Sequence, residues 1–220
     1  YKQSGSNQRI TYFTEMTIEE NVALIRKSID EINKNCQIVA ATKTRDRATV
    51  TKCMATRMVL AAGENRVQEL VEKYTDEYRW DFIGRLQTNK VKYIIDKVEL
   101  IHSLDRADLC AAIQKECVKK NKAKQKTLIE INTGLEENKG GIRLDNLDEF
   151  LDEVSKFDRI EVDGLMAVAP LWYDEDALKK TFDEVYEEFF KRKNDTFKEL
   201  SMGMSGDYLI AAKCGATIVR

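Results

Sequence analysis

The sequence contains one histidine, one proline and no Cys-x-x-Cys pair. His102 is the only imidazole and the five cysteines lie far apart, so no group of side chains has the spacing of a zinc site. An odd number of scattered cysteines is typical of reduced thiols rather than of a disulfide framework. We therefore expect a cytoplasmic chain that holds no metal.

The sequence also lacks a long apolar run and an excess of either charge. No stretch approaches the roughly 20 apolar residues that a membrane-spanning helix requires. The 36 basic residues nearly balance the 38 acidic ones, and the net charge of -2 gives no overall attraction to nucleic acids or anionic lipids. We expect neither a nucleic acid nor a membrane as a partner.

Residues 1–15 are polar and show no clear periodicity, and we interpret them as an extension or a tag remnant. Thr17 and Glu20 have the spacing of a capping box, so a first helix is expected to begin there. One proline and ten glycines form no linker in the rest of the chain. The sequence therefore predicts one domain over residues 16–220.

Strand-like and helix-like segments alternate from residue 17 to the end of the sequence. An apolar helical repeat from Ile18 to Ile32 predicts the first helix over 17–34. Apolar runs predict eight strands, near 36–42, 57–61, 80–83, 98–102, 126–131, 160–164, 198–201 and 216–219. Segments of helical composition lie between them, at about 47–56, 65–78, 86–96, 105–122, 145–156, 174–192 and 205–214.

This alternation requires the strands to pair in parallel through helical crossovers. Eight such strands within 220 residues favour an α/β fold, a single (β/α)8 TIM-type barrel with an extra N-terminal helix. The helix that would follow the eighth strand is absent from the sequence. A doubly wound open sheet is the alternative fold.

Polar residues follow three of the strand ends, where barrels of this type carry their functional groups. An amine such as Lys43, leaving the apolar first strand, is desolvated, loses its proton more readily and forms an imine with an aldehyde. Ser201 ends the seventh strand. Gly203 allows close approach there, and Ser205 can cap the next helix, whose free N–H groups attract an anion. Arg220 ends the eighth strand and can donate to an unprotonated pyridine nitrogen.

Each of these residues also has a simpler interpretation: a solvent-exposed lysine, a capped turn and an arginine at a frayed end. Together, an amine, an anion-binding turn and a guanidinium suit an aldehyde that carries a phosphate and a ring nitrogen. Pyridoxal 5'-phosphate is the candidate cofactor. Polar segments after three other predicted strands, at 63–69, 82–90 and 131–141, are consistent with helix capping, a polar barrel rim and either a lid or a surface turn.

Eight motifs closely resemble those of the pyridoxal phosphate homeostasis protein family. They are ATKT at 41–44, GENRVQEL at 63–70, FIGRLQTNK at 82–90, IHSLDR at 101–106, INTGLEENKGG at 131–141, GLMAVAP at 164–170, LSMGMSGDY at 200–208 and GATIVR at 215–220. They occur in one order and cover the chain from Met16 onward. Such a series is far more specific than any single glycine-rich turn.

The resemblance implies a barrel similar to the N-terminal domain of alanine racemase, with pyridoxal phosphate bound as an imine. By position, Lys43 matches the family's Schiff-base lysine, Ser201 a phosphate contact and Arg220 the arginine that faces the pyridine nitrogen. Asn65 and Met204 match residues near the cofactor. The family is regarded as a carrier or regulator of free pyridoxal phosphate without an established reaction.

The sequence departs from the family pattern in three places. Asp81 stands where the family usually has histidine, so any role of that imidazole is absent. The segment Arg-Asp-Arg at 45–47 makes the loop after the lysine more polar than usual. The sequence stops at Arg220, where the family continues with a Gly-Ser/Thr segment that completes the phosphate site.

We therefore expect a monomeric protein that binds pyridoxal phosphate and buffers or delivers it, with no catalytic residue. Apoenzymes that depend on pyridoxal phosphate are the expected protein partners. The alternative is a racemase-like enzyme, which in the related fold needs a second acid/base group from an additional β domain, for which no sequence remains. A third interpretation is a protein-interaction role of the acidic helix at 174–192, whose charges are more typical of a solvated face.

Overall fold

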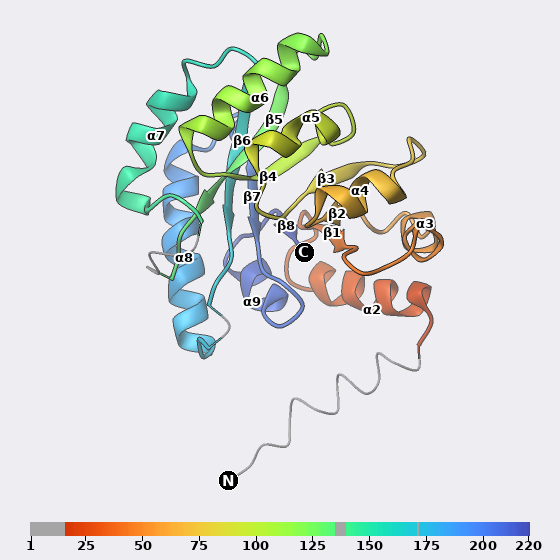
Figure 1. Ribbon diagram of the computed structural model, residues 1–220. Helices are drawn as coiled ribbons and strands as arrows, with labels where there is room; N and C mark the ends of the chain where they lie inside the picture. The colour runs from red at the N-terminus through yellow and green to blue at the C-terminus, as the bar shows by residue number, and fades with distance from the viewer. Residues whose placement is uncertain (1–15, 135–139, 171) are drawn as a thin grey trace.

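Eight parallel strands form a closed barrel (Figure 1). The structure is a computed structural model that describes residues 16–134, 140–170 and 172–220. Each strand pairs with the next one in the sequence, and the last pairs with the first. This confirms the (β/α)8 barrel and excludes the open sheet. The strands are β1 (Gln37–Ala41), β2 (Ala61–Glu64), β3 (Trp80–Phe82), β4 (Leu100–Leu104), β5 (Gln125–Ile131), β6 (Ile160–Ala167), β7 (Glu199–Met202) and β8 (Ile218–Val219).

Helices cover the outside of the barrel (Figure 1). The first described helix, α2 (Ile18–Asp30), precedes β1 and is the extra N-terminal helix that the sequence predicts. Two short 3-10 helices, η1 (Thr88–Lys90) and η2 (Leu144–Asn146), directly precede the helices labelled α5 and α7, whose bounds follow. The successive connections between strands contain α3 (Arg47–Ala55), α4 (Val67–Lys73), α5 (Val91–Ile94), α6 (Ala107–Lys119), α7 (Leu147–Val154), α8 (Glu175–Arg192) and α9 (Tyr208–Lys213).

Residues 1–15, which we interpret as an extension, and residues 135–139 of the long loop lie outside the described residues. Among the described helices, none combines the length and the apolar character needed to cross a membrane. The described residues also contain no cluster of three or more His, Cys, Asp or Glu side chains suited to a metal ion.

Helix α2 begins where the capping box predicts. The Thr17 hydroxyl accepts the N–H of Glu20 (3.2 Å), and the Glu20 carboxylate accepts the N–H of Thr17 (2.8 Å). Near the other end of the helix, Arg26 donates to the carbonyl of Cys36 (2.7 Å), just before β1. Both ends of α2 are therefore fixed by side chains that the sequence places at these positions.

The second strand is displaced from its predicted position. We expect it near 57–61, but β2 begins at Ala61 and runs to Glu64. Arg57 adopts a positive φ of 57° and turns the chain before the strand. All four residues of β2 are buried, and the space beside β1 admits small residues there. Small residues do not stand out as an apolar run, so the prediction was shifted toward the larger side chains before the strand.

Three predicted helices are shorter than expected. The segment at 65–78 is helical only in α4, because Tyr74 leaves the helical region with ψ 135°. The segment at 86–96 is divided into η1 and the four-residue α5. The segment at 205–214 is helical only from Tyr208 to Lys213. None of these three α-helices has a side-chain hydrogen bond at its N-cap.

The apolar core has two layers, one on each face of the barrel. The outer layer lies between strands and helices and includes Phe82 and Leu200. The inner layer lies inside the barrel and includes Met166 of β6 and Ile218 of β8. On β7, the residue in register with these two is the polar Ser201. This inner layer is therefore apolar except at β7. The inner layer consists of Val39, Ala61, Ile83, Leu100, Leu128, Met166 and Ile218.

Gly164 allows β6 to approach β7 closely. Its φ is +152°, and a Cβ at this position would lie 1.8 Å from the carbonyl oxygen of Glu199. We expect Gly164→Ala to lower the free energy of unfolding by roughly 2–5 kcal/mol, because backbone strain and the clash add. Urea denaturation followed by circular dichroism measures this loss.

Gly206→Ala is the matched control, since a Cβ at Gly206 meets no atom within 4 Å. We expect it to change the free energy of unfolding by less than about 0.5 kcal/mol. If the two substitutions have equal effects, β6 and β7 separate without a penalty and the prediction is wrong.

Candidate functional site

The barrel brings the five predicted site residues to the carboxyl ends of its strands. Lys43 follows β1, Asn65 follows β2, and Arg220 follows β8 directly. Ser201 lies within β7, and Met204 lies in the turn after it. Because β8 pairs with β1, the lysine and the arginine follow neighbouring strands.

The main chain on both sides of Lys43 is fixed. Thr42 is buried, and its hydroxyl donates to Oε1 of Glu64 (2.7 Å). Thr44 has a φ of +65°, which is unusual for a β-branched residue. Its N–H donates to Oε2 of Glu69 (2.8 Å), which stabilises this conformation. The lysine therefore extends from a constrained loop.

The Lys43 side chain itself is exposed. The sequence predicts an amine desolvated by its apolar strand, and in the protein alone this prediction is wrong. Burial ends at Thr42, whose hydroxyl hydrogen-bonds to the end of β2. The next side chain along the loop is therefore left in solvent.

A buried lysine holds this loop against α4. Lys73 donates to the carbonyl of Thr42 (2.9 Å), to Oε1 of Glu64 (2.5 Å) and to Oε2 of Glu69 (3.0 Å). Glu64 is fully buried and Lys73 is 7% exposed. The other oxygen of Glu64 accepts the N–H of Asn65 (3.1 Å). One buried ion pair thus fixes the two loops that carry the first two predicted site residues.

The carboxylates keep Lys73 charged in spite of its burial. Burial disfavours the ammonium, but hydrogen bonds and attraction to Glu64 and Glu69 outweigh it and raise the pKa of Lys73. The N–H of Thr44, and after it Lys73, lower the pKa of Glu69. The hydrogen bonds that fix the loop therefore persist at neutral pH.

Arg220 is 9% exposed and is held by β6 and β7. Its Nη1 donates to the carbonyl (2.9 Å) and the hydroxyl (2.6 Å) of Ser201, and its Nη2 donates to the carbonyl of Ala167 (2.8 Å). Nε takes no part in these bonds. Burial lowers the pKa of Arg220 to about 10, although Asp207 and Glu130 act to raise it. The guanidinium therefore stays charged at neutral pH.

Ser201 is fully buried, and its hydroxyl lies between Arg220 and Nδ1 of His102 (3.0 Å). Its contact with a phosphate stays a prediction. In the turn that follows, Ser205 and Gly206 are exposed. Within the described part of the chain, the N–H groups of these two residues donate to no protein acceptor. They are therefore available to an anion.

The helix after this turn begins later than predicted. We expect Ser205 to cap it, but α9 starts at Tyr208 with Asp207 as its N-cap. The Asp207 carboxylate accepts the N–H of Met204 and so closes the turn before the helix begins. The predicted cap is wrong because the N–H groups of Asp207 and Tyr208, which a cap at Ser205 would bind, donate to the carbonyl of Met204 instead (3.0 and 2.9 Å).

Asn65 and Met204 are both half-buried. A close approach of the next loop fixes Asn65, because a Cβ at Gly84 would lie 2.3 Å from the Asn65 carbonyl oxygen. The glycine of the FIGRLQTNK segment therefore lets the loop after β3 pack on the loop after β2. Contacts of Asn65 and Met204 with a cofactor stay predictions.

Sequence reasoning missed three polar residues inside the barrel as members of the site. His102 and Glu130 lie two positions beyond the inner-layer residues of β4 and β5, so strand alternation places them on the same face. Asp81 lies 3.3 Å from His102. Burial, and after it Asp105, raise the pKa of Glu130 to about 7. Counting alternate positions toward the carboxyl end of each strand would have identified the first two.

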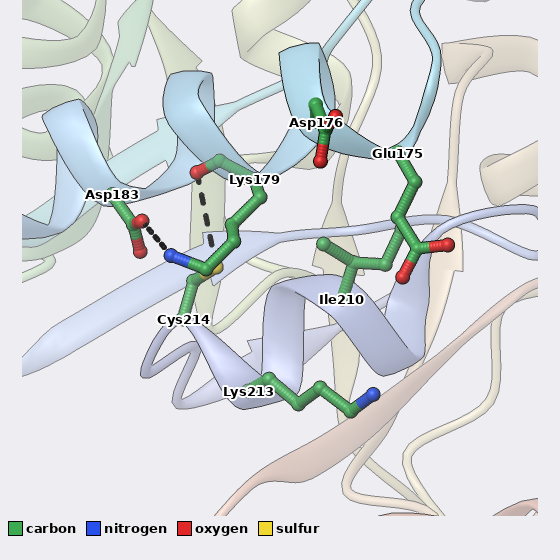
Figure 2. A pocket seen from close by; sticks show the side chains of 7 residues that line it. All are labelled: Glu175, Asp176, Lys179, Asp183, Ile210, Lys213 and Cys214. Carbon is green, nitrogen blue, oxygen red and sulfur yellow. Dashed lines mark hydrogen bonds and ion pairs between the residues drawn. The ribbon is translucent and has the colours of Figure 1, made fainter.

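Two cavities lie apart from these residues. A cavity of about 600 Å³ lies between the end of β5 and α8, and its lining includes Asn132 and Tyr173. None of the five predicted site residues lines either cavity. Figure 2 shows the other cavity, of about 130 Å³, which α8 and α9 line with Glu175, Asp176, Lys179, Asp183, Ile210, Lys213 and Cys214.

Comparison with known proteins gives consistent matches. The family model of the alanine racemase N-terminal domain matches residues 15–220. The chain is 45% identical over 165 residues to the pyridoxal phosphate homeostasis protein of Aquifex aeolicus, covering 72% of each protein. It is 32% identical over 223 residues to the protein of the same name from Haemophilus influenzae, covering 93% of each.

Among solved structures, the chain resembles PipY of Synechococcus elongatus with pyridoxal phosphate bound. The TM-score is 0.81 at 25% identity, and the match covers 93% of this chain and 97% of PipY. The structure of PipY without pyridoxal phosphate matches with a TM-score of 0.83 at 26% identity, over the same shares of the two chains.

Lys73→Met leaves the buried carboxylate of Glu64 without its counter-ion. We expect it to lower the free energy of unfolding by about 3–5 kcal/mol. Adding Glu64→Gln to this variant should recover part of the loss, because no buried charge is then left alone. Chemical denaturation of the single and double variants measures both effects.

Lys180→Met is the control, because the Lys180 side chain is 79% exposed and its ion pair with Glu184 spans 3.9 Å. We expect a change below about 0.5 kcal/mol. A loss in Lys73→Met no greater than in this control would mean that the buried ion pair does not hold the loops.

Proposed function

The chain belongs to the pyridoxal phosphate homeostasis protein family, and from this membership we propose that it binds pyridoxal 5'-phosphate at the carboxyl end of its barrel. The proposed attachment is a Schiff base to Lys43, and the proposed role is to buffer the cofactor or deliver it. One observation carries the proposal: an exposed lysine on a fixed loop and a buried, charged arginine, Arg220, follow neighbouring strands.

The groups at this end of the barrel fit the three parts of pyridoxal phosphate that need partners. The aldehyde needs an amine, which Lys43 provides. The phosphate needs N–H donors, which the exposed turn at Ser205 and Gly206 provides. The ring nitrogen needs a donor, and Nε of Arg220 makes none of the hydrogen bonds that hold this guanidinium among the described residues. The similarity to PipY, which was solved with pyridoxal phosphate bound, supports the same choice of ligand.

The fixed loop favours attachment at Lys43. Pyridoxal phosphate supplies an aldehyde that condenses with an amine and a ring that withdraws electrons. The backbone around the lysine is already ordered by Glu64 and Glu69, so only the side chain loses freedom when the bond forms. Ordering the partner in advance makes such a bond more favourable.

Arg220 favours storage of the cofactor over turnover. A guanidinium only donates hydrogen bonds, so a ring nitrogen that faces it acts as an acceptor and stays unprotonated. A ring in that state withdraws electrons weakly, which disfavours removal of a proton from an attached amino acid. The burial of Arg220 and its three hydrogen bonds to Ser201 and Ala167 support this role.

Racemase-like activity is the second candidate, and Glu130 is the observation that favours it. A carboxyl group with a pKa of about 7 exchanges protons readily at neutral pH. The relatives from Aquifex aeolicus and Haemophilus influenzae are nevertheless named as homeostasis proteins rather than as enzymes. We therefore rank binding and delivery first and assign no catalytic residue.

The proposal extends to the setting of the protein in the cell. The five cysteines are free thiols, and burial raises the pKa of the Cys110 thiol to about 12. Free thiols are typical of reducing compartments. We propose a cytoplasmic monomer that passes pyridoxal phosphate to dependent apoenzymes. Sedimentation of the purified protein checks the monomeric state.

Lys43→Ala should abolish the covalent adduct that borohydride forms when the protein is mixed with pyridoxal phosphate. The exposed side chain contributes little to the core, so the circular dichroism spectrum should stay unchanged. Mass spectrometry of the reduced protein measures the adduct. Weak binding through the phosphate is expected to remain.

Lys180→Ala serves as the control for nonspecific reaction with exposed lysines, and it should keep the full adduct. An adduct of equal yield in Lys43→Ala would place the attachment on another residue.

The loaded protein should produce neither D-amino acids nor keto acids from individual L-amino acids beyond the amount that free pyridoxal phosphate produces. The reason is the charged donor that we place opposite the ring nitrogen. Chiral chromatography after prolonged incubation measures both products. Steady turnover of any amino acid would favour the racemase-like alternative.

A further inference from the structure

A file of hydrogen-bonded polar side chains leads through the barrel interior to Arg220. Nε and Nη2 of Arg79 donate to the two oxygens of Asp81 (2.8 and 3.1 Å). Oδ2 of Asp81 lies 3.3 Å from Nε2 of His102, and Nδ1 of His102 lies 3.0 Å from the hydroxyl of Ser201. The Ser201 hydroxyl in turn accepts from Nη1 of Arg220 (2.6 Å).

The three central members of this file have no contact with solvent. Asp81, His102 and Ser201 are each 0% exposed. A buried polar group without a partner is unfavourable by about 1–3 kcal/mol, so each atom has to be satisfied by its neighbour in the file. The direction of every hydrogen bond is therefore constrained.

The charged ends determine that direction. Both oxygens of Asp81 accept from Arg79, so Asp81 acts as an acceptor and Nε2 of His102 carries the proton that faces it. Burial lowers the pKa of His102, Asp81 acts to raise it, and the two arginines lower it further. His102 is therefore neutral, and its Nδ1 accepts the O–H of Ser201. The Ser201 oxygen is then free to accept only from Arg220.

We propose that Asp81, His102 and Ser201 are positioning residues that hold the guanidinium of Arg220 in a single orientation. The consequence for ligand binding rests on the proposed function: with Nη1 and Nη2 fixed by Ser201 and Ala167, the Nε–H group has a defined position from which to donate to the ring nitrogen. The Nε2–H tautomer of His102 is the element on which this arrangement depends.

The sequence provides a direct test of the tautomer. His102 is the only histidine of the chain, so protein labelled with ¹⁵N in histidine gives one pair of ring-nitrogen signals. In protein without added pyridoxal phosphate we expect a neutral ring with the proton on Nε2 at neutral pH. A charged ring, or a proton on Nδ1, would overturn the proposal.

Two variants separate positioning from simple packing. Asp81→Asn offers an amide in place of an acceptor-only carboxylate and should allow a mixture of tautomers. Ser201→Ala keeps Asp81 as acceptor, so the Nε2–H tautomer should persist while the Nδ1 signal shifts because its donor is lost. Ser155→Ala removes an exposed serine hydroxyl that donates to the carbonyl of Asp152 in α7 and should leave both signals unchanged.

The same variants test the consequence for binding. We expect Ser201→Ala and Asp81→Asn to weaken the affinity for pyridoxal phosphate about three- to tenfold, as for the loss of one hydrogen bond. Unchanged affinity in Ser201→Ala would show that Arg220 needs no such support. If Asp81→Asn does not fold, the spectrum of the unmodified protein and Ser201→Ala still decide the question.

The outcomes also separate this proposal from the proposed function. If borohydride produces no adduct on Lys43 in the unmodified protein, the proposed function fails, while the tautomer of His102 still tests the file. If the adduct forms and the tautomer is not Nε2–H, the function stands and the positioning role is wrong.

Discussion

Closure of the barrel through β8 is the constraint on which the site depends. This strand has two residues, and it pairs with β1 from Gln37 opposite Ile218 to Ile38 opposite Val219. In an open sheet of eight strands, the first and last strands would lie roughly 34 Å apart at about 4.8 Å per step. Closure makes them neighbours, so the residues that follow them come together at one end of the barrel.

Two buried polar networks set the geometry around that region, one on each face of the barrel wall. Glu64 and Lys73 fix the loops after β1 and β2 from the side of the helices, and the file from Arg79 to Arg220 lies on the inner side. Buried ion pairs add little net stability compared with apolar packing, but breaking one is strongly unfavourable. The apolar layers therefore stabilise the barrel, and the networks select one arrangement of its loops.

The sequence allowed the fold to be predicted because alternation of strands and helices is a local property. The position of Lys43 at a strand end was predictable for the same reason. The environment of Ser201 was not, because its partner His102 lies 99 positions away in the sequence. The register that places Ser201 between Met166 and Ile218 appears only when the barrel is closed. Likewise, β2 begins with three small residues, Ala61, Ala62 and Gly63, whose burial depends on neighbouring strands.

The seven apolar side chains of the inner layer also limit the routes by which a ligand enters and leaves the barrel. A packed layer of this kind leaves no channel along the barrel axis, so a molecule held near Lys43 arrives and departs through the same opening. The packed layer excludes transfer of the ligand through a second opening at the opposite end of the barrel. Under the proposed delivery role, an acceptor protein has to dock over the opening from which the ligand leaves, or else capture the ligand after its release into solvent.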